Sequence, residues 1–111
     1  PTLPTKTITI SIAGPPQQVY EDVSNPENLP RDGPLGFRFL PRNEWGVLDH
    51  AVRLPSGMEV LVPMRVVPNG DGSEVMLTLY QAPGMPDGKL AEDEKLVERD
   101  MATLKRILES A

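Results

Sequence analysis

The residue of this sequence with the clearest potential for chemistry is His50, the single histidine of the chain. An imidazole titrates near neutral pH, so a histidine that faces a pocket can act as general acid or base, or can orient a ligand carbonyl. The simpler alternative is a core histidine satisfied by a backbone group or a water. Asp49 precedes it, but adjacent strand residues point to opposite faces, so Asp49 cannot complete a catalytic dyad.

Other kinds of reactive site have little support in the sequence. The chain has no cysteine, and one histidine among scattered carboxylates gives no metal-ligand spacing. No serine stands in a Gly-x-Ser-x-Gly elbow. Gly70 and Gly72 belong to a turn signal rather than to a phosphate loop. We therefore expect no metal and no cofactor, and whether the protein is an enzyme stays open.

Composition bounds the class of protein. A chain of 111 residues with 39% apolar and 24% charged residues is typical of one globular domain, expected to span residues 1–111. The net charge of −5 without a basic cluster argues against nucleic-acid binding. No stretch approaches the roughly 18 apolar residues of a membrane span. The absence of cysteine favours a cytoplasmic protein, because the cytoplasm is reducing.

Two helices and one strand are predicted outside the central part of the chain. Residues 6–13 alternate, with Ile8, Ile10 and Ile12 on one face, which is typical of a half-buried strand. Residues 15–24 have helical spacing behind two prolines. Residues 86–110 form a long amphipathic helix for which Asp87 is the predicted N-cap. The apolar stripe of that helix consists of Leu90, Val97, Met101, Leu104 and Leu108.

The region from Phe37 to Ala82 predicts an antiparallel meander, because three turn signals separate four segments of alternating apolar residues. A two-residue loop at Asn43 and Glu44 would pair Phe39 with Leu48 and Phe37 with His50. The other two turns predict the pairs Leu54–Met58, Val52–Val60, His50–Val62, Leu48–Met64, Val62–Leu79, Met64–Leu77 and Val66–Val75. All three turns place the apolar residues on the same face.

This inner face and the long helix define the candidate ligand site. The candidate ligand-binding residues are Phe37, Phe39, Leu48, His50, Met58, Val62, Met64, Leu79, Gln81, Val97 and Met101. Gln81 could bind a ligand at the pocket mouth or simply reach solvent. Met58 and Met64 could form an adaptable lining or ordinary core filling, since thioethers suit both.

The opposite face of the meander carries charged and apolar residues together. Arg38, Arg53 and Arg65 fall near Asp49 and Glu59 and indicate a lattice of surface ion pairs. The same face also carries Leu61, Met76 and Tyr80. We therefore predict either a monomer or a homodimer that uses this face.

The chain combines an isoleucine-rich strand, a helix that opens with Pro15-Pro16-Gln17-Gln18-Val19-Tyr20, the stop Asn25-Pro26-Glu27-Asn28-Leu29-Pro30, the meander and the long final helix. Together these motifs resemble the START-like superfamily (SRPBCC), which includes polyketide cyclases and lipid-transfer domains. The segments Gly46-Val47-Leu48-Asp49-His50, Val62-Pro63-Met64-Arg65-Val66 and Pro83-Gly84-Met85 look like an uncharacterised bacterial subfamily.

The resemblance implies an α+β helix-grip fold, in which a curved antiparallel sheet wraps around the C-terminal helix. It also implies a cavity between sheet and helix that binds a small hydrophobic or amphipathic molecule such as a lipid. The alternative is an enzyme similar to polyketide cyclases or dehydratases, with His50 as acid or base and Tyr80 or Gln81 assisting.

The chain departs from this superfamily after Pro30. Members usually place an aromatic residue there, followed by further helix and strand, whereas Arg31 is followed at once by Asp32-Gly33-Pro34. Either part of the sheet has been lost, or an internal segment is absent between about residues 30 and 35. We favour the absent segment.

Overall fold

The computed structural model of the protein describes residues 2–25, 36–54 and 56–110. Its elements are β1 (Thr5–Ile12), α1 (Pro16–Ser24), β2 (Gly36–Phe39), β3 (His50–Arg53), β4 (Glu59–Val62), β5 (Met64–Asn69), β6 (Gly72–Tyr80) and α2 (Lys89–Glu109). The predicted α+β class is confirmed. The short connection predicted after Pro30 lies outside the described residues.

The strands form two antiparallel sheets with the orders β1-β6-β5 and β2-β3-β4. Pro63 lies between β4 and β5, and a proline cannot donate to a ladder. The two sheets still meet, because Val47 bridges Arg65 and the Leu48 amide donates to the Met64 carbonyl at 2.8 Å. The strands of the predicted meander therefore follow one another in antiparallel order, but their hydrogen-bonded ladders belong to two sheets.

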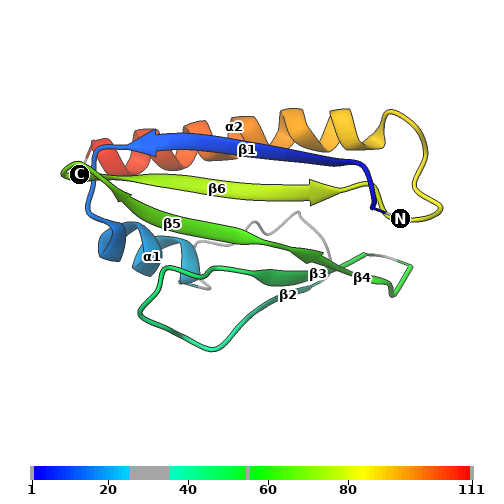
Figure 1. The fold of residues 1–111 in the computed structure, drawn as a ribbon, viewed down its shortest axis with the longest axis horizontal. Helices are drawn as coiled ribbons and strands as arrows, with labels where there is room; N and C mark the ends of the chain where they lie inside the picture. The colour runs from blue at the N-terminus through cyan, green and yellow to red at the C-terminus, as the bar shows by residue number, and fades with distance from the viewer. Residues whose placement is uncertain (1, 26–35, 55, 111) are drawn as a thin grey trace.

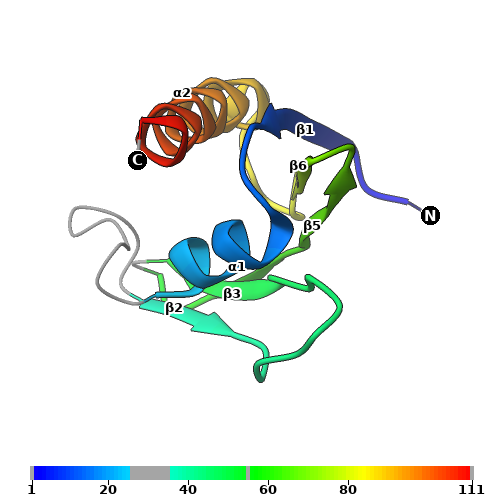
Figure 2. The same ribbon diagram turned by 90° about the vertical axis from the view of Figure 1, so that its left-hand side faces the viewer.

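The two sheets together form a curved wall, and both helices lie on its concave side (Figure 2). α2 runs along β1 and β6, and α1 packs on β5 and β6 (Figure 1). Viewed along the strands, the wall curves from β1 beside α2 to β2 and β3 on the opposite side, with α1 in between (Figure 2). Within the described residues, neither helix is long and apolar enough to cross a membrane.

Most of the predicted register is confirmed. His50 pairs with Val62 and Val52 with Val60 across β3 and β4, while Met64–Leu77 and Val66–Val75 join β5 to β6. The β5–β6 turn is tighter than predicted, since Asn69 already pairs with Gly72. The register follows from alternation, since a slip of one residue would expose the whole apolar face.

The predicted register between β2 and β3 is wrong by two residues. Phe39 pairs with His50 rather than with Leu48, and Phe37 pairs with Val52 rather than with His50. The cause is a wider loop, closed by a hydrogen bond from the Leu40 amide to the Asp49 carbonyl at 3.1 Å. A shift of two residues keeps each residue on its predicted face.

The side chain of Asn43 holds this loop. Its Oδ1 accepts from the amides of Trp45 at 3.0 Å and Val47 at 3.1 Å, and its Nδ2 donates to the Val47 carbonyl at 2.9 Å. The Asn43 amide donates to the hydroxyl of Tyr20 in α1 at 3.0 Å. An asparagine that bonds its own neighbouring backbone is a strong turn former, and here it builds a loop of several residues.

The predicted start of the long helix is also wrong. α2 begins at Lys89 rather than at Pro86, and its N-cap is Gly88 with φ of 88° and no side-chain cap, so Asp87 is not the N-cap. The predicted apolar stripe is confirmed. Leu90, Met101 and Leu108 are buried, and Val97 and Leu104 are partly buried against the core.

One hydrophobic core joins both sheets and both helices. Its buried members are Ile8, Ile12, Val19, Tyr20, Leu48, Val62, Met64, Val66, Val75, Leu77, Met101 and Leu108. Residues from β1, α1, β4, β5, β6 and α2 thus share one interior.

Candidate functional site on the inner face

The structure brings most of the predicted ligand-site residues into this single core. Leu48, Val62, Met64 and Met101 are buried in it, whereas Phe39, Leu79 and Val97 are only partly buried against it. The partly buried residues come from β2, β6 and α2 and therefore from opposite sides of the interior. The inner face is apolar and incompletely covered.

His50 lies in this face with 7% of its surface exposed. Its Nδ1 is 3.0 Å from the Leu48 carbonyl oxygen, which can only accept, so Nδ1 carries the proton. The imidazole packs against Phe39 with ring centroids 5.1 Å apart. Burial lowers the pKa of His50, although the Leu48 carbonyl and the Asp49 charge act in the opposite direction. The ring is therefore neutral at neutral pH.

Stability is expected to fall as the pH drops below about 6.5, the ordinary pKa of histidine. The unfolded chain takes up a proton at His50 there, while the folded chain, whose His50 pKa is lowered, does not. The free energy of unfolding should decline with a slope of at most about 1.4 kcal/mol per pH unit until the folded pKa is reached. Urea denaturation between about pH 5.5 and 7.5, one unit either side of that pKa, measures this slope. In His50→Asn the slope should vanish; an unchanged slope would assign it to another group.

Asp49 lies on the face of the strand opposite His50, where its carboxylate binds Arg65 and the Met64 amide. Its Oδ2 accepts from Arg65 Nη2 at 2.8 Å, and its Oδ1 accepts from Arg65 Nε at 3.1 Å and from the Met64 amide at 2.8 Å. The hydrogen bond from Arg65 holds the pKa of Asp49 below its usual value. The side chain of Asp49 thus fastens the segment before β3 to β5.

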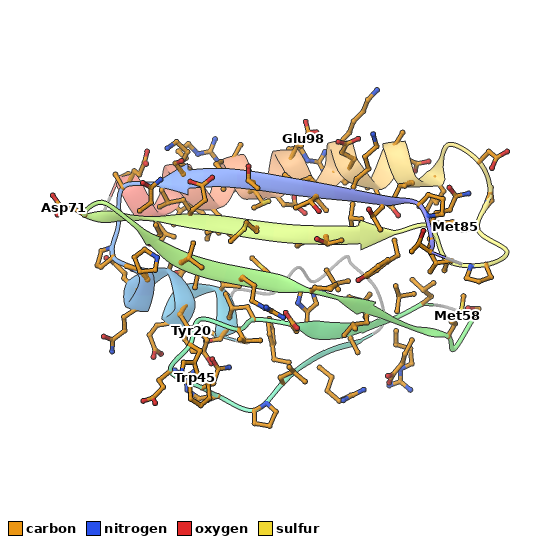
Figure 3. All side chains as sticks on the ribbon, in the orientation of Figure 1. Tyr20, Trp45, Met58, Asp71, Met85 and Glu98 are labelled. Atoms are coloured by element: carbon orange, nitrogen blue, oxygen red, sulfur yellow. The ribbon has the colours of Figure 1, made fainter. Side chains whose placement is uncertain are left out.

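The remaining predicted site residues lie away from this centre. Met58 is 47% exposed near the end of the β3–β4 hairpin (Figure 3). Gln81 follows β6, and its Nε2 is 3.4 Å from both the Met85 carbonyl and Asp87 Oδ1, so it braces the loop before α2. The backbone of Phe37 pairs with Val52; its side chain lies outside what the structure describes.

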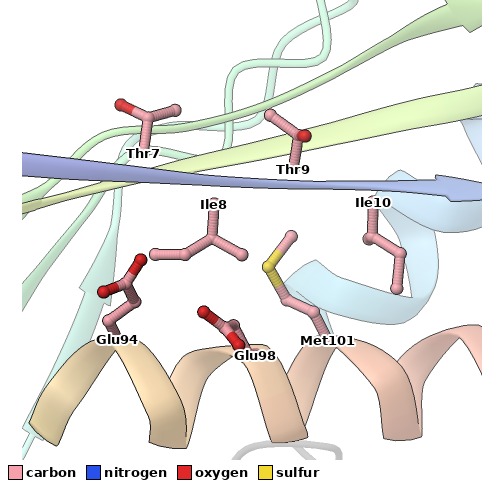
Figure 4. Close-up of a pocket in the computed structure, with 7 residues that line it drawn as sticks. All are labelled: Thr7, Ile8, Thr9, Ile10, Glu94, Glu98 and Met101. Atoms are coloured by element: carbon pink, nitrogen blue, oxygen red, sulfur yellow. The ribbon is translucent and has the colours of Figure 1, made fainter. Parts of the chain in front are cut away.

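A groove that sequence reasoning missed lies between β1 and α2. It has a volume of about 390 Å³ and is open to solvent, with Thr7, Ile8, Thr9, Ile10, Glu94, Glu98 and Met101 as lining residues. Ile8 and Ile10 point toward α2, whereas Thr7 and Thr9 point away from it (Figure 4). A pair of glutamates one helical turn apart beside an alternating strand was the available signal.

No protein-family model matches the sequence, and no curated protein matches it either. Solved structures do match. The Aha1 dimer from Colwellia psychrerythraea has a TM-score of 0.75 at 16% identity, covering 96% of this chain and 97% of that one. An AHSA1-like protein from Rhizobium etli has a TM-score of 0.69 at 18% identity, covering 98% and 84%.

A third solved structure, Ara h 8.0201, has a TM-score of 0.54 at 10% identity and covers 98% of this chain and 97% of its own. At such identities the likeness concerns the fold. The elements agree with it, because a curved antiparallel wall lies against a long C-terminal helix, with a short helix after the first strand. The predicted resemblance is thus confirmed at the level of the fold, which is a helix grip.

Proposed function

We propose that the protein binds a small hydrophobic or amphipathic molecule against the inner face, between the sheet and α2. The observation that carries this proposal is the set of core residues left only partly buried, which are Phe39, Val52, Leu79, Val97 and Leu104 together with others at the margin of the core. They belong to both sheets and to α2. Covering such apolar surface is favourable by about 25 cal/mol per Å².

His50 fits this proposal as a ligand-orienting residue. It is a polar group within an apolar face, as in small-molecule sites that combine apolar lining with few polar groups. Its contacts with the Leu48 carbonyl and the Phe39 ring fix its orientation. Tyr80, the suggested catalytic helper, pairs with Thr5 and alternates with Leu79, so it lies on the opposite face. We therefore propose binding rather than catalysis.

Native mass spectrometry of freshly purified protein tests the proposal directly. We expect a population that carries one small molecule, released on denaturation and soluble in organic solvent. Absence of any bound molecule, together with no uptake of long-chain fatty acids or of an apolar fluorescent dye, would contradict it.

Two neighbouring residues of α2 provide a matched pair of variants. Val97 is partly buried against the core, whereas Leu96 is 41% exposed. Val97→Lys should weaken binding of an apolar fluorescent dye about tenfold or more, because a charge would face the apolar surface. Leu96→Lys should leave affinity within about twofold.

Circular dichroism checks that both variants keep their helix content. If Val97→Lys does not fold, the isosteric Val97→Thr replaces it, with an expected loss of about threefold to tenfold, since a hydroxyl group is costly at an apolar contact. Equal dye affinities of the Val97 and Leu96 variants would place the dye elsewhere on the protein.

A further inference from the structure

β1 is an outer strand of the β1-β6-β5 sheet. The register shows which of its residues direct their backbone N–H and C=O groups toward β6 and which toward the open edge. The Gln81 amide donates to the Pro4 carbonyl at 2.9 Å, which continues the register of Thr5 with Tyr80. In an antiparallel ladder the bonded residues alternate. The even-numbered residues of β1 therefore bond to β6, and Thr5, Thr7, Thr9 and Ser11 direct their backbone groups toward the open edge.

Side chains of α2 close this edge at its C-terminal end. Lys105 Nζ donates to the Ser11 carbonyl at 2.6 Å, and Glu109 Oε2 accepts from the Ala13 amide at 2.8 Å. Lys105 and Glu109 also pair with each other at 2.8 Å. Within the described part of the chain, no hydrogen bond of this kind reaches the outward backbone groups of Thr7 or Thr9.

The groove between β1 and α2 lies at this uncovered part of the edge. Ile8, Ile10 and Met101 form its apolar floor, and Glu94 and Glu98 line it from α2 (Figure 4). The ion pairs found among the described residues of α2 involve neither Glu94 nor Glu98. Unpaired edge groups, an apolar floor and two carboxylates thus meet in one place.

We propose that this edge binds an extended basic peptide segment, which adds as a strand beside Thr7 and Thr9. Its backbone would bond to the outward groups of β1, as in other cases of strand addition to a sheet edge. Side chains on one face of the segment would lie over Ile8 and Ile10, with a lysine or arginine between Glu94 and Glu98. This site borders the inner-face ligand site of the proposed function and shares Met101 with it, but its partner would pair with the backbone of β1.

Charge favours a basic partner over a second copy of this chain. Each copy carries a net charge of −5, and like net charges oppose association. Two copies joined through β1 would also bring two pairs of Glu94 and Glu98 toward one symmetry axis, against one Lys6 from each strand. A lysine-rich segment is instead attracted by the carboxylates of Glu94 and Glu98 and by the net negative charge of the whole protein.

A synthetic peptide of alternating lysine and valine tests the proposal. Its binding should slow hydrogen exchange of the Thr7 and Thr9 amides and leave that of Ile8 and Ile10 unchanged, because those amides already face β6. The same peptide with every amide N-methylated keeps its charge and loses its donors, so it should bind at least about tenfold more weakly. Equal binding of the methylated peptide would overturn strand addition.

Variants of the protein separate the contribution of the two glutamates from that of the backbone hydrogen bonds. Glu94→Gln combined with Glu98→Gln should weaken peptide binding about fivefold to tenfold at low salt, and Asp100→Asn on the same helix should change it less than twofold. Thr9→Pro should also reduce binding, since it removes a donor on the open edge and spares the β6 ladder. Unchanged affinity of the double glutamine variant would overturn the proposed basic specificity.

Light scattering on the protein without peptide gives a further decisive outcome. A dimer in which the Thr7 and Thr9 amides are already protected from exchange would show that a second copy occupies the edge, and would overturn the proposal. Because dye binding and its loss in Val97→Lys report on the inner face, failure of either proposal leaves the other separately testable.

Discussion

Replacing Gly46 by alanine is expected to lower the free energy of unfolding by about 3 kcal/mol or more. Gly46 has φ of +71°, and a Cβ there would lie 2.2 Å from the Val66 carbonyl oxygen. That oxygen belongs to β5, whose backbone pairs with Val75 and cannot yield easily. The Gly46 carbonyl also accepts from the Val66 amide at 3.0 Å, so the substitution would break this contact between the sheets.

Gly57→Ala is the matched control for Gly46→Ala. Gly57 has φ of +89°, but a Cβ there would have no atom within 4 Å. Its cost should therefore be only the conformational one, about 1 kcal/mol. Urea unfolding followed by far-ultraviolet circular dichroism measures both variants. Equal losses would mean that the approach of Gly46 to Val66 contributes nothing beyond its dihedral angle.

Leu48→Ala is expected to cost about 3 to 4 kcal/mol, because Leu48 is 1% exposed and truncation would leave a cavity at the junction of the two sheets. Leu61→Ala removes the same atoms at a position that is 55% exposed and should cost less than about 0.5 kcal/mol. Thermal and urea denaturation of the two variants provide the comparison. A small loss for Leu48→Ala would show that the surrounding side chains collapse into the space.

Alternation of apolar residues was sufficient to predict the faces of the strands. The expected residues are buried, among them Ile8, Ile12, Val66 and Val75. When one face of a strand is apolar, only one register buries that face, because a slip of one residue would expose it. Loop lengths were harder to predict. The Asn43 side chain binds backbone groups of Trp45 and Val47, and its backbone amide binds the Tyr20 hydroxyl of α1; contacts of this kind leave no periodic signal in the sequence.

The start of α2 shows a similar limit. Pro86 and Asp87 look like a helix start, yet Gly88 adopts a left-handed conformation and Gln81 reaches both Met85 and Asp87. For the site, sequence patterning identified most of the apolar residues that share the core, although Met58 is exposed. It did not predict the groove beside β1, because the open edge of a strand follows from the order of strands and not from their composition.

The pairing of β1 with β6 has a consequence for the order in which this chain can fold. Thr7 and Thr78 share a hydrogen bond across 71 positions of sequence, and Ala13 and Glu109 share one across 96. Contacts of such separation slow folding, because the loop between them must be closed first. During synthesis, β1 leaves the ribosome well before β6 and α2. The isoleucine side chains of β1 therefore stay exposed to solvent until β6 and α2, which cover them, have been synthesised.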